Sequence, residues 1–405
     1  MQAALHSRMR TARHAGFTLI ELLVAMVVGL VIVMALMKVT TNFESSKRQA
    51  EGNTAMGFNA GFISYDIDRQ MRSAGSGFLT NYAQALGCTL NVNNSSVGQV
   101  LPLPSALAAP FASVPLQVRL IPVLIHAGIG AGGSDVVAIM GSSAGEGESA
   151  IQVRSGSPVG ATQVSLKSTV GVNGDDMLLL IENKRSCMMT QVATSYATNA
   201  NSSIVPLAGA FFSTNINGHS LTDYGAAESA SMLMFGNATN NRPVMMLYGV
   251  DTDHTLYGFD LLRATSTARY AVARDVQDLR ALYGVDTNDD GIIDTWKKPT
   301  DTGYTVADLT AGTPAAQTNL VHIRAVRIAM VVHSDRLEKP DIVSAPSSLP
   351  LFSDLPSQAM TITLTGTDLQ RHYKVVDFTI PLRNALTRPL VDPTTLAAVP
   401  TQAVP

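Results

Sequence analysis

The strongest constraint on this 405-residue chain lies at its N-terminus, where a basic segment leads into a long apolar one. Arg8, Arg10 and Arg13 stand in a leader without acidic residues, and residues 17–37 are then broken by a single charge, Glu21. As a helix this run is roughly 31 Å long at ~1.5 Å per residue, enough to cross a bilayer, and the basic flank should stay cytoplasmic. A secretory signal has a shorter apolar core and a small-residue cleavage site. The sequence therefore predicts a membrane anchor.

Glu21 needs an explanation, because a carboxylate in a membrane helix is costly and is a functional candidate by default. Residues 16–23, G-F-T-L-I-E-L-L, resemble the class III signal of type IV prepilins. The resemblance implies that prepilin peptidase cuts after Gly16, that the new Phe17 amine is methylated, and that the helix stays on the mature protein. It also implies that Glu21 neutralises the Phe17 amine of a neighbouring subunit. An unpaired buried charge is heavily penalised, so this pairing would select one axial register.

The rest of the chain predicts an α+β fold, with a long N-terminal pilin helix followed by a large β-rich head of mostly antiparallel strands. No proline precedes Pro102, so the helix can continue to about residues 75–77. Short apolar runs between Gly, Asn and Ser clusters then indicate strands at 136–140, 163–167, 177–181, 232–235, 244–248, 326–332 and 360–364. A partial apolar face at 274–283 favours one further helix.

Four segments follow from these patterns. Residues 1–16 are the expected leader, and residues 17–76 the N-terminal helix with its transmembrane part at 17–37. Residues 77–388 form the head, and residues 389–405 a proline-rich tail. The net charge is −3, which does not favour nucleic acid as a direct primary partner. The only cysteines, Cys88 and Cys187, would both face an oxidising periplasm, so we expect a disulfide between them.

Acidic residues cluster in the head, in the segment D-T-N-D-D-G-I-I-D at 286–294. Oxygen ligands at alternating positions with glycine at the turn are able to wrap a hard cation. A complete EF-hand would add a bidentate glutamate where this chain has Lys297. We therefore expect a Ca²⁺ site of modest affinity, and the alternative is an Asn/Asp-rich turn without metal. The expected ligands are the side chains of Asp286, Asn288, Asp290 and Asp294 and the carbonyl of Ile292.

Two weaker motifs do not lead to an enzyme. Residues 141–145 fit G-x-S-x-G around Ser143, but a nucleophile elbow needs a helix after the serine and this sequence is a poor helix start. Residues 128–133 fit G-x-G-x-x-G, but the following residues favour another strand and hence a hairpin. We expect no catalytic residues, and a hydrolase reading would rest on Ser143 alone.

Three further segments resemble the PilW-like minor pilins: residues 66–75, residues 282–286 and residues 378–384. The resemblance implies a structural minor pilin that assembles with other minor pilins and the major pilin to prime or cap a type IV pilus. It would be anchored in the bacterial inner membrane with its head in the periplasm, and would later reach the pilus and the cell surface. A type II secretion pseudopilin shares the N-terminal signal and remains an alternative, as does a membrane-anchored adhesin or binding module.

Overall fold

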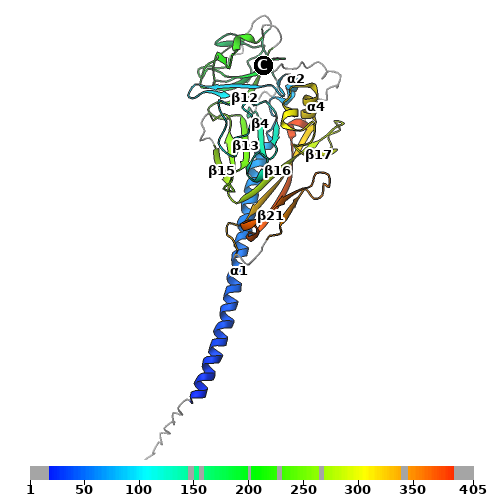
Figure 1. Cartoon of the computed structure of the whole chain (residues 1–405). Coiled ribbons are helices and arrows are strands. Elements are labelled where there is room, and N and C mark those ends of the chain that lie inside the picture. The colour runs from blue at the N-terminus through cyan, green and yellow to red at the C-terminus, as the bar shows by residue number, and fades with distance from the viewer. Residues whose placement is uncertain are drawn as a thin grey trace, which may run out of the picture. The chain divides into compact units, whose positions relative to one another are not determined.

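Figure 1 shows the computed structural model of the chain, which describes residues 18–144, 150–154, 159–198, 202–225, 230–263, 269–338 and 345–386, the side chains of residues 45 and 48 excepted. Residue contacts divide it into two compact units, Met1–Thr54 and Ala55–Pro405. The expected α+β architecture is confirmed, with a long first helix and a head of mostly antiparallel sheets. Gly16, Phe17 and the tail at 389–405 lie outside the described residues.

Helix α1, Leu19–Arg72, is long and apolar enough near its start to cross a membrane. Its side chains are exposed throughout residues 19–43. Farther along, five residues at helical spacing form one buried face of the helix: Met56, Ala60, Ile63, Ile67 and Met71. The helix ends at Arg72, and Gly75 in the following turn has φ 79°, a left-handed conformation that glycine adopts without steric cost.

Three sheets form most of the head (Figure 1). The first has the order β2-β1-β8-β7-β12-β5, and only its β1–β8 pair is parallel. The second has the order β15-β14-β13-β4-β3, and the third β17-β16-β18-β21. The strands of the first are β1 Leu90–Asn94, β2 Gly98–Leu101, β5 Ile151–Gln152, β7 Asp176–Ile181, β8 Cys187–Gln191 and β12 Ser231–Asn237. Those of the second are β3 Val123–His126, β4 Val136–Gly141, β13 Val244–Val250, β14 Leu256–Asp260 and β15 Arg269–Ala273. Those of the third are β16 Val276–Val285, β17 Thr295–Lys297, β18 Ile323–His333 and β21 Tyr373–Pro381.

Smaller elements connect these sheets. Three two-stranded ribbons pair β6 Gln163–Ser165 with β9 Ile204–Pro206, β10 Asn215–Ile216 with β11 His219–Ser220, and β19 Ser348–Leu351 with β20 Met360–Thr363. The short α-helices are α2 Tyr82–Ala85, α3 Val306–Leu309, α4 Pro314–His322 and α5 Arg383–Leu386. The 3-10 turns are η1 Leu79–Asn81, η2 Ala131–Gly133, η3 Leu221–Asp223 and η4 Gly366–Gln370.

The strand predictions are confirmed, and the glycine-rich segment 128–133 does join β3 to β4 as a hairpin. The helix predicted at 274–283 is wrong, because residues 276–283 belong to β16, which pairs with β18 along its length and with β17 at its C-terminal end. A strand at the centre of a sheet buries apolar side chains on both faces. Leu279 and Tyr283 point to one face of the sheet and Leu282 to the other, yet all three are fully buried. Their spacing of three and four residues is also typical of the apolar face of a helix, which explains the wrong prediction.

Candidate functional site

The first turn of α1 fixes the carboxylate of Glu21. Thr18 lies just before the helix, and its backbone N–H and Oγ1 both donate to Glu21 Oε2, at 3.3 and 3.2 Å. Thr18 Oγ1 in turn accepts from the backbone N–H of Glu21, at 3.3 Å. This reciprocal pair is a capping box, which satisfies donors that a helix start leaves unpaired. Sequence reasoning missed it, although the Thr-x-x-Glu spacing was its signal.

Within the head, α1 has a second face that points away from the core. Phe58, Phe62 and Tyr65 follow one another at spacings of four and three residues, so they share one side of the helix. Their exposed fractions are 79 %, 51 % and 66 %, respectively. Large apolar side chains grouped on a surface mark interaction sites in soluble proteins. This outward aromatic face of α1 is the clearest candidate contact surface of the head.

Polar contacts hold α1 in the head beside its buried face. The hydroxyl of Tyr248 on β13 donates to Asp66 Oδ2 at 2.9 Å. The side-chain amide of Asn384 on α5 donates to the carbonyl of Ala74, just after the helix, at 2.9 Å. The C-terminal part of the head is thereby tied to the end of α1, although the two lie far apart in sequence.

Cys88 and Cys187 form a disulfide, as predicted. Both are buried, and their Cα atoms are 5.7 Å apart across a sequence separation of 99. Cys187 begins β8, and its pairing partner in β1 is Leu90, two residues after Cys88. The disulfide thus fastens the β1–β2 edge of the first sheet at its only parallel pair.

The acidic segment 286–294 forms the loop between β16 and β17. Asp286 is fully buried, and its Oδ2 accepts from the backbone N–H of Gly291 at 3.0 Å, while Oδ1 has no partner among the described residues. Asp294 accepts from the backbone N–H and the hydroxyl of Thr287, at 2.7 and 2.6 Å, and these bonds lower the pKa of its carboxyl. Gly291 has φ 86°, which the tight turn requires.

A cation from the protein itself lies beside this loop. Arg324 on β18 is 5 % exposed, and its Nη2 lies 2.6 Å from Asp289 Oδ1. Its Nε lies 3.4 Å from Asp286 Oδ2, and Nη1 donates to the carbonyl of Ala385 on α5. Sequence reasoning missed Arg324, because it approaches the loop only through the pairing of β16 with β18.

The remaining predicted ligands stay near the surface. Asn288 and Asp290 bond to each other, with Asn288 Nδ2 donating to Asp290 Oδ2 at 3.1 Å, and the side chain of Ile292 is 68 % exposed. In the part of the chain that the structure describes, no three Asp, Glu, His or Cys side chains gather as a metal-binding group. The geometry brings Asp286 and its loop to Arg324.

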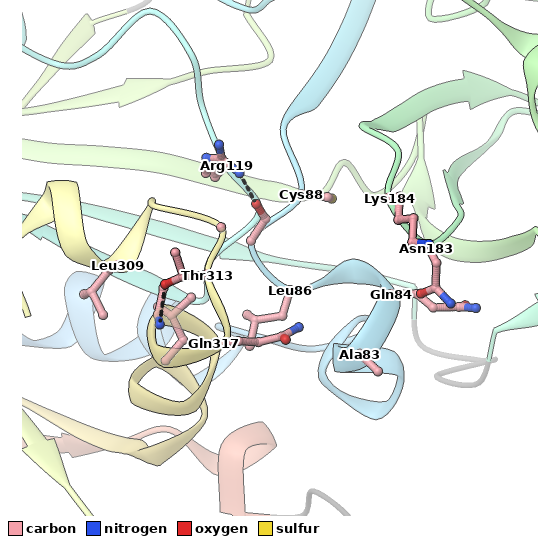
Figure 2. Close-up of a pocket in the computed structure, with 14 residues that line it drawn as sticks. Ala83, Gln84, Leu86, Cys88, Arg119, Asn183, Lys184, Leu309, Thr313 and Gln317 are labelled. Carbon is pink, nitrogen blue, oxygen red and sulfur yellow. Dashed lines mark hydrogen bonds between the residues drawn. The ribbon is translucent and has the colours of Figure 1, made fainter. Parts of the chain in front are cut away.

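A small pocket opens beside the disulfide, with a volume of about 50 Å³ (Figure 2). Arg119 donates to the carbonyl of Gly87 at 2.8 Å on one side, and Lys184 lies with Gln84 on the other side in this view. These polar side chains do not converge on a common point, so the pocket has no evident chemistry. At Ser143, the hydroxyl donates to the carbonyl of Asn241 at 2.6 Å.

Two family models match the chain. Residues 11–37 match the prokaryotic N-terminal methylation motif, and residues 234–384 match PilW, the type IV pilus-assembly protein W family. The second match runs from β12 to α5 and includes the acidic loop and Arg324. No curated protein and no solved structure matches the chain significantly. The N-terminal apolar helix and the prepilin motif fit anchoring in the inner membrane together with a pilin-like role in pilus assembly. Over these residues the chain is similar to PilW-like proteins and carries a match to the class III prepilin signal.

Proposed function

We propose that this protein is a structural minor pilin that assembles with other minor pilins to prime or cap a type IV pilus. The proposal rests on one combination: the chain has a prepilin motif, and the outward aromatic face of α1 is exposed in the head. A helix buried on one side only, with aromatic side chains on the other, is suited to packing against further subunits. The role is structural rather than catalytic.

The proposed path begins in the inner membrane, with α1 as the anchor and the head in the periplasm. Prepilin peptidase removes residues 1–16, and the amine of Phe17 is methylated. The mature subunit then joins other minor pilins and the major pilin, and reaches the cell surface with the fibre. Attachment to surfaces and twitching would follow from the completed pilus.

In-cell photo-cross-linking on α1 tests this proposal. A photoreactive residue at position 62 would lie on the outward face, whereas the same residue at position 63 would point into the core, because Ile63 is fully buried. We expect position 62 to capture other minor pilins and the major pilin, and position 63 to yield only crosslinks within the chain. Equal capture at both positions would contradict the role of the aromatic face.

The same experiment separates the alternatives. Capture of secretion pseudopilins at position 62 would favour a type II secretion role.

A pilus count on cells lacking the protein distinguishes priming from adhesion. Loss of pili supports a primer or cap, whereas normal pili with reduced surface attachment support an adhesin. N-terminal sequencing of the mature chain should begin at Phe17, and a chain that still begins at Met1 would contradict processing.

We also propose that the loop Asp286–Asp294 binds Ca²⁺ and braces the head. Within the described part of the chain, buried Asp286 retains an oxygen without a partner, and backbone N–H groups already orient the carboxylates. Arg324 compensates part of the negative charge, which together with Lys297 in place of a bidentate ligand is consistent with modest affinity. Calcium would reinforce a loop that Arg324 connects to α5.

A further inference from the structure

A cavity of about 200 Å³ lies on one face of the second sheet and opens to solvent at one side. Its floor is set by strand register. Ala138 on β4 lies directly between Leu124 on β3 and Leu247 on β13. Because alanine stands where its two neighbours carry leucine, the sheet surface has a depression at its centre. Segment 114–119 and α3 complete the walls, and the exposed residues Pro115 and Gln117 form a rim.

One polar side chain lies deep in this apolar floor. His126 on β3 is 5 % exposed, and its imidazole has no hydrogen-bond partner among the described residues. Burial lowers the pKa of His126 to about 4, so the ring is neutral at cellular pH. A neutral imidazole offers one donor and one acceptor. The ring nitrogens of His126 are not closed off in the core but remain accessible through the cavity, so a molecule bound there can pair with them.

The walls decide what kind of partner fits. Water is held in a cavity by two to four polar groups, whereas apolar cavities of about 150 Å³ stay dry and accept benzene-sized molecules. Here Leu124, Leu247 and Met140 surround His126 with apolar surface. Arg119 also contributes to the wall, and its Nη1 donates to the carbonyl of Gly87. The site therefore suits a ring slightly larger than benzene with one hydrogen-bonding group.

We propose that this cavity is a binding site for a small neutral organic molecule, an apolar ring bearing one N–H or O–H group that hydrogen-bonds to His126. The ligand enters past the rim at Pro115 and Gln117. Its ring covers Ala138, and its polar group meets the imidazole. This binding activity is separate from the proposed assembly role, because the outward aromatic face of α1 is not part of the cavity wall.

The test uses the full chain in detergent micelles with ¹³C-methyl methionine and indole as the probe. Met140 reports on the cavity floor, and Met26 in the apolar span reports on partition into the micelle. Met188 belongs to a separate core cluster and does not line the cavity, so it reports on the fold. Indole should shift Met140 saturably and leave Met188 unchanged. Toluene, which lacks the N–H group, should bind roughly three- to tenfold more weakly.

Three variants make the inference refutable. Ala138→Phe fills the floor and Thr310→Phe obstructs the α3 wall, so each should abolish the Met140 response while Met188 confirms the fold. His126→Leu should bind indole and toluene equally. Absence of a saturable Met140 shift with indole would overturn the proposal, as would a response that survives both filling variants. Tighter binding of benzoate than of indole would instead assign the site to carboxylates through Arg119 and would refute the neutral ligand.

Discussion

The carboxylate of Glu21 has two possible tasks, and two substitutions separate them. In the isolated subunit it completes the capping box with Thr18. In a fibre it would pair with the Phe17 amine of a neighbouring subunit. Glu21→Gln keeps a side chain that can serve in a capping box but removes the charge, whereas Glu21→Ala removes both.

The two tasks differ in magnitude. A lost helix cap costs about 1 kcal/mol, which is a factor of about five in an assembly equilibrium. Leaving a buried charge without its partner costs about 3–5 kcal/mol, which exceeds a factor of 100. If pairing fixes the register, Glu21→Gln and Glu21→Ala should therefore both fall more than about 100-fold in pilus incorporation. Membrane insertion should not suffer, because the variants remove a costly group from the apolar span.

Quantitative immunoblots of sheared pili, normalised to the membrane fraction, measure this directly. Thr18→Ala is the matched control, since it breaks the cap and leaves the Glu21 charge, and its loss should be about fivefold. Near-wild-type incorporation of Glu21→Gln together with a severalfold loss in Glu21→Ala would refute the pairing argument. The cap alone would then explain the glutamate.

Three further predictions concern the head. Replacing Cys88 and Cys187 together by serine should lower the free energy of unfolding by up to about 4.7 kcal/mol, because the disulfide links residues separated by 99 positions. Urea unfolding measures this, and an unchanged midpoint would contradict it. Calcium at about 100-fold excess over its dissociation constant should stabilise the full chain by about 2.7 kcal/mol in thermal melts against chelator. Asp290→Ala should remove the gain, whereas Asp253→Ala, in the turn between β13 and β14, should keep it. Identical wild-type melts with and without calcium would leave a metal-free turn. Between pH 6.5 and about 4 the unfolded chain binds a proton at His126 that the folded chain does not. The free energy of unfolding should therefore decrease by about 3 kcal/mol in total as the pH is lowered through this range. His126→Leu should remove that part of the pH dependence, and superimposable profiles would contradict it.

Local signals in the sequence predicted a large part of this structure. The apolar span, the strands bounded by glycine and asparagine, and the disulfide all follow from short-range patterns and from the compartment that the N-terminus implies. The capping box at Thr18 and Glu21 was equally local and was overlooked. By contrast, β16 was assigned to a helix, because burial on both of its faces depends on which distant segments pack against the two sides of the sheet.

The parts that the sequence did not predict depend on register between distant segments. Arg324 reaches Asp289 because β18 pairs with β16 in one particular alignment. The cavity exists because that same kind of alignment places Ala138 between two leucines. A shift of one residue would exchange the two faces of the strand, so neither site can be read from residue types alone.

The buried face of α1 has a mechanical consequence. From Met56 to Met71 the helix advances about 22 Å at ~1.5 Å per residue, and five side chains along that length are embedded in the head. A pull directed along the helix axis loads these five contacts in parallel as shear, together with the Tyr248 and Asn384 hydrogen bonds. Sliding the helix by even one turn requires all of them to break at once. The force along the helix is therefore shared among several contacts with the head, and no single contact carries all of it.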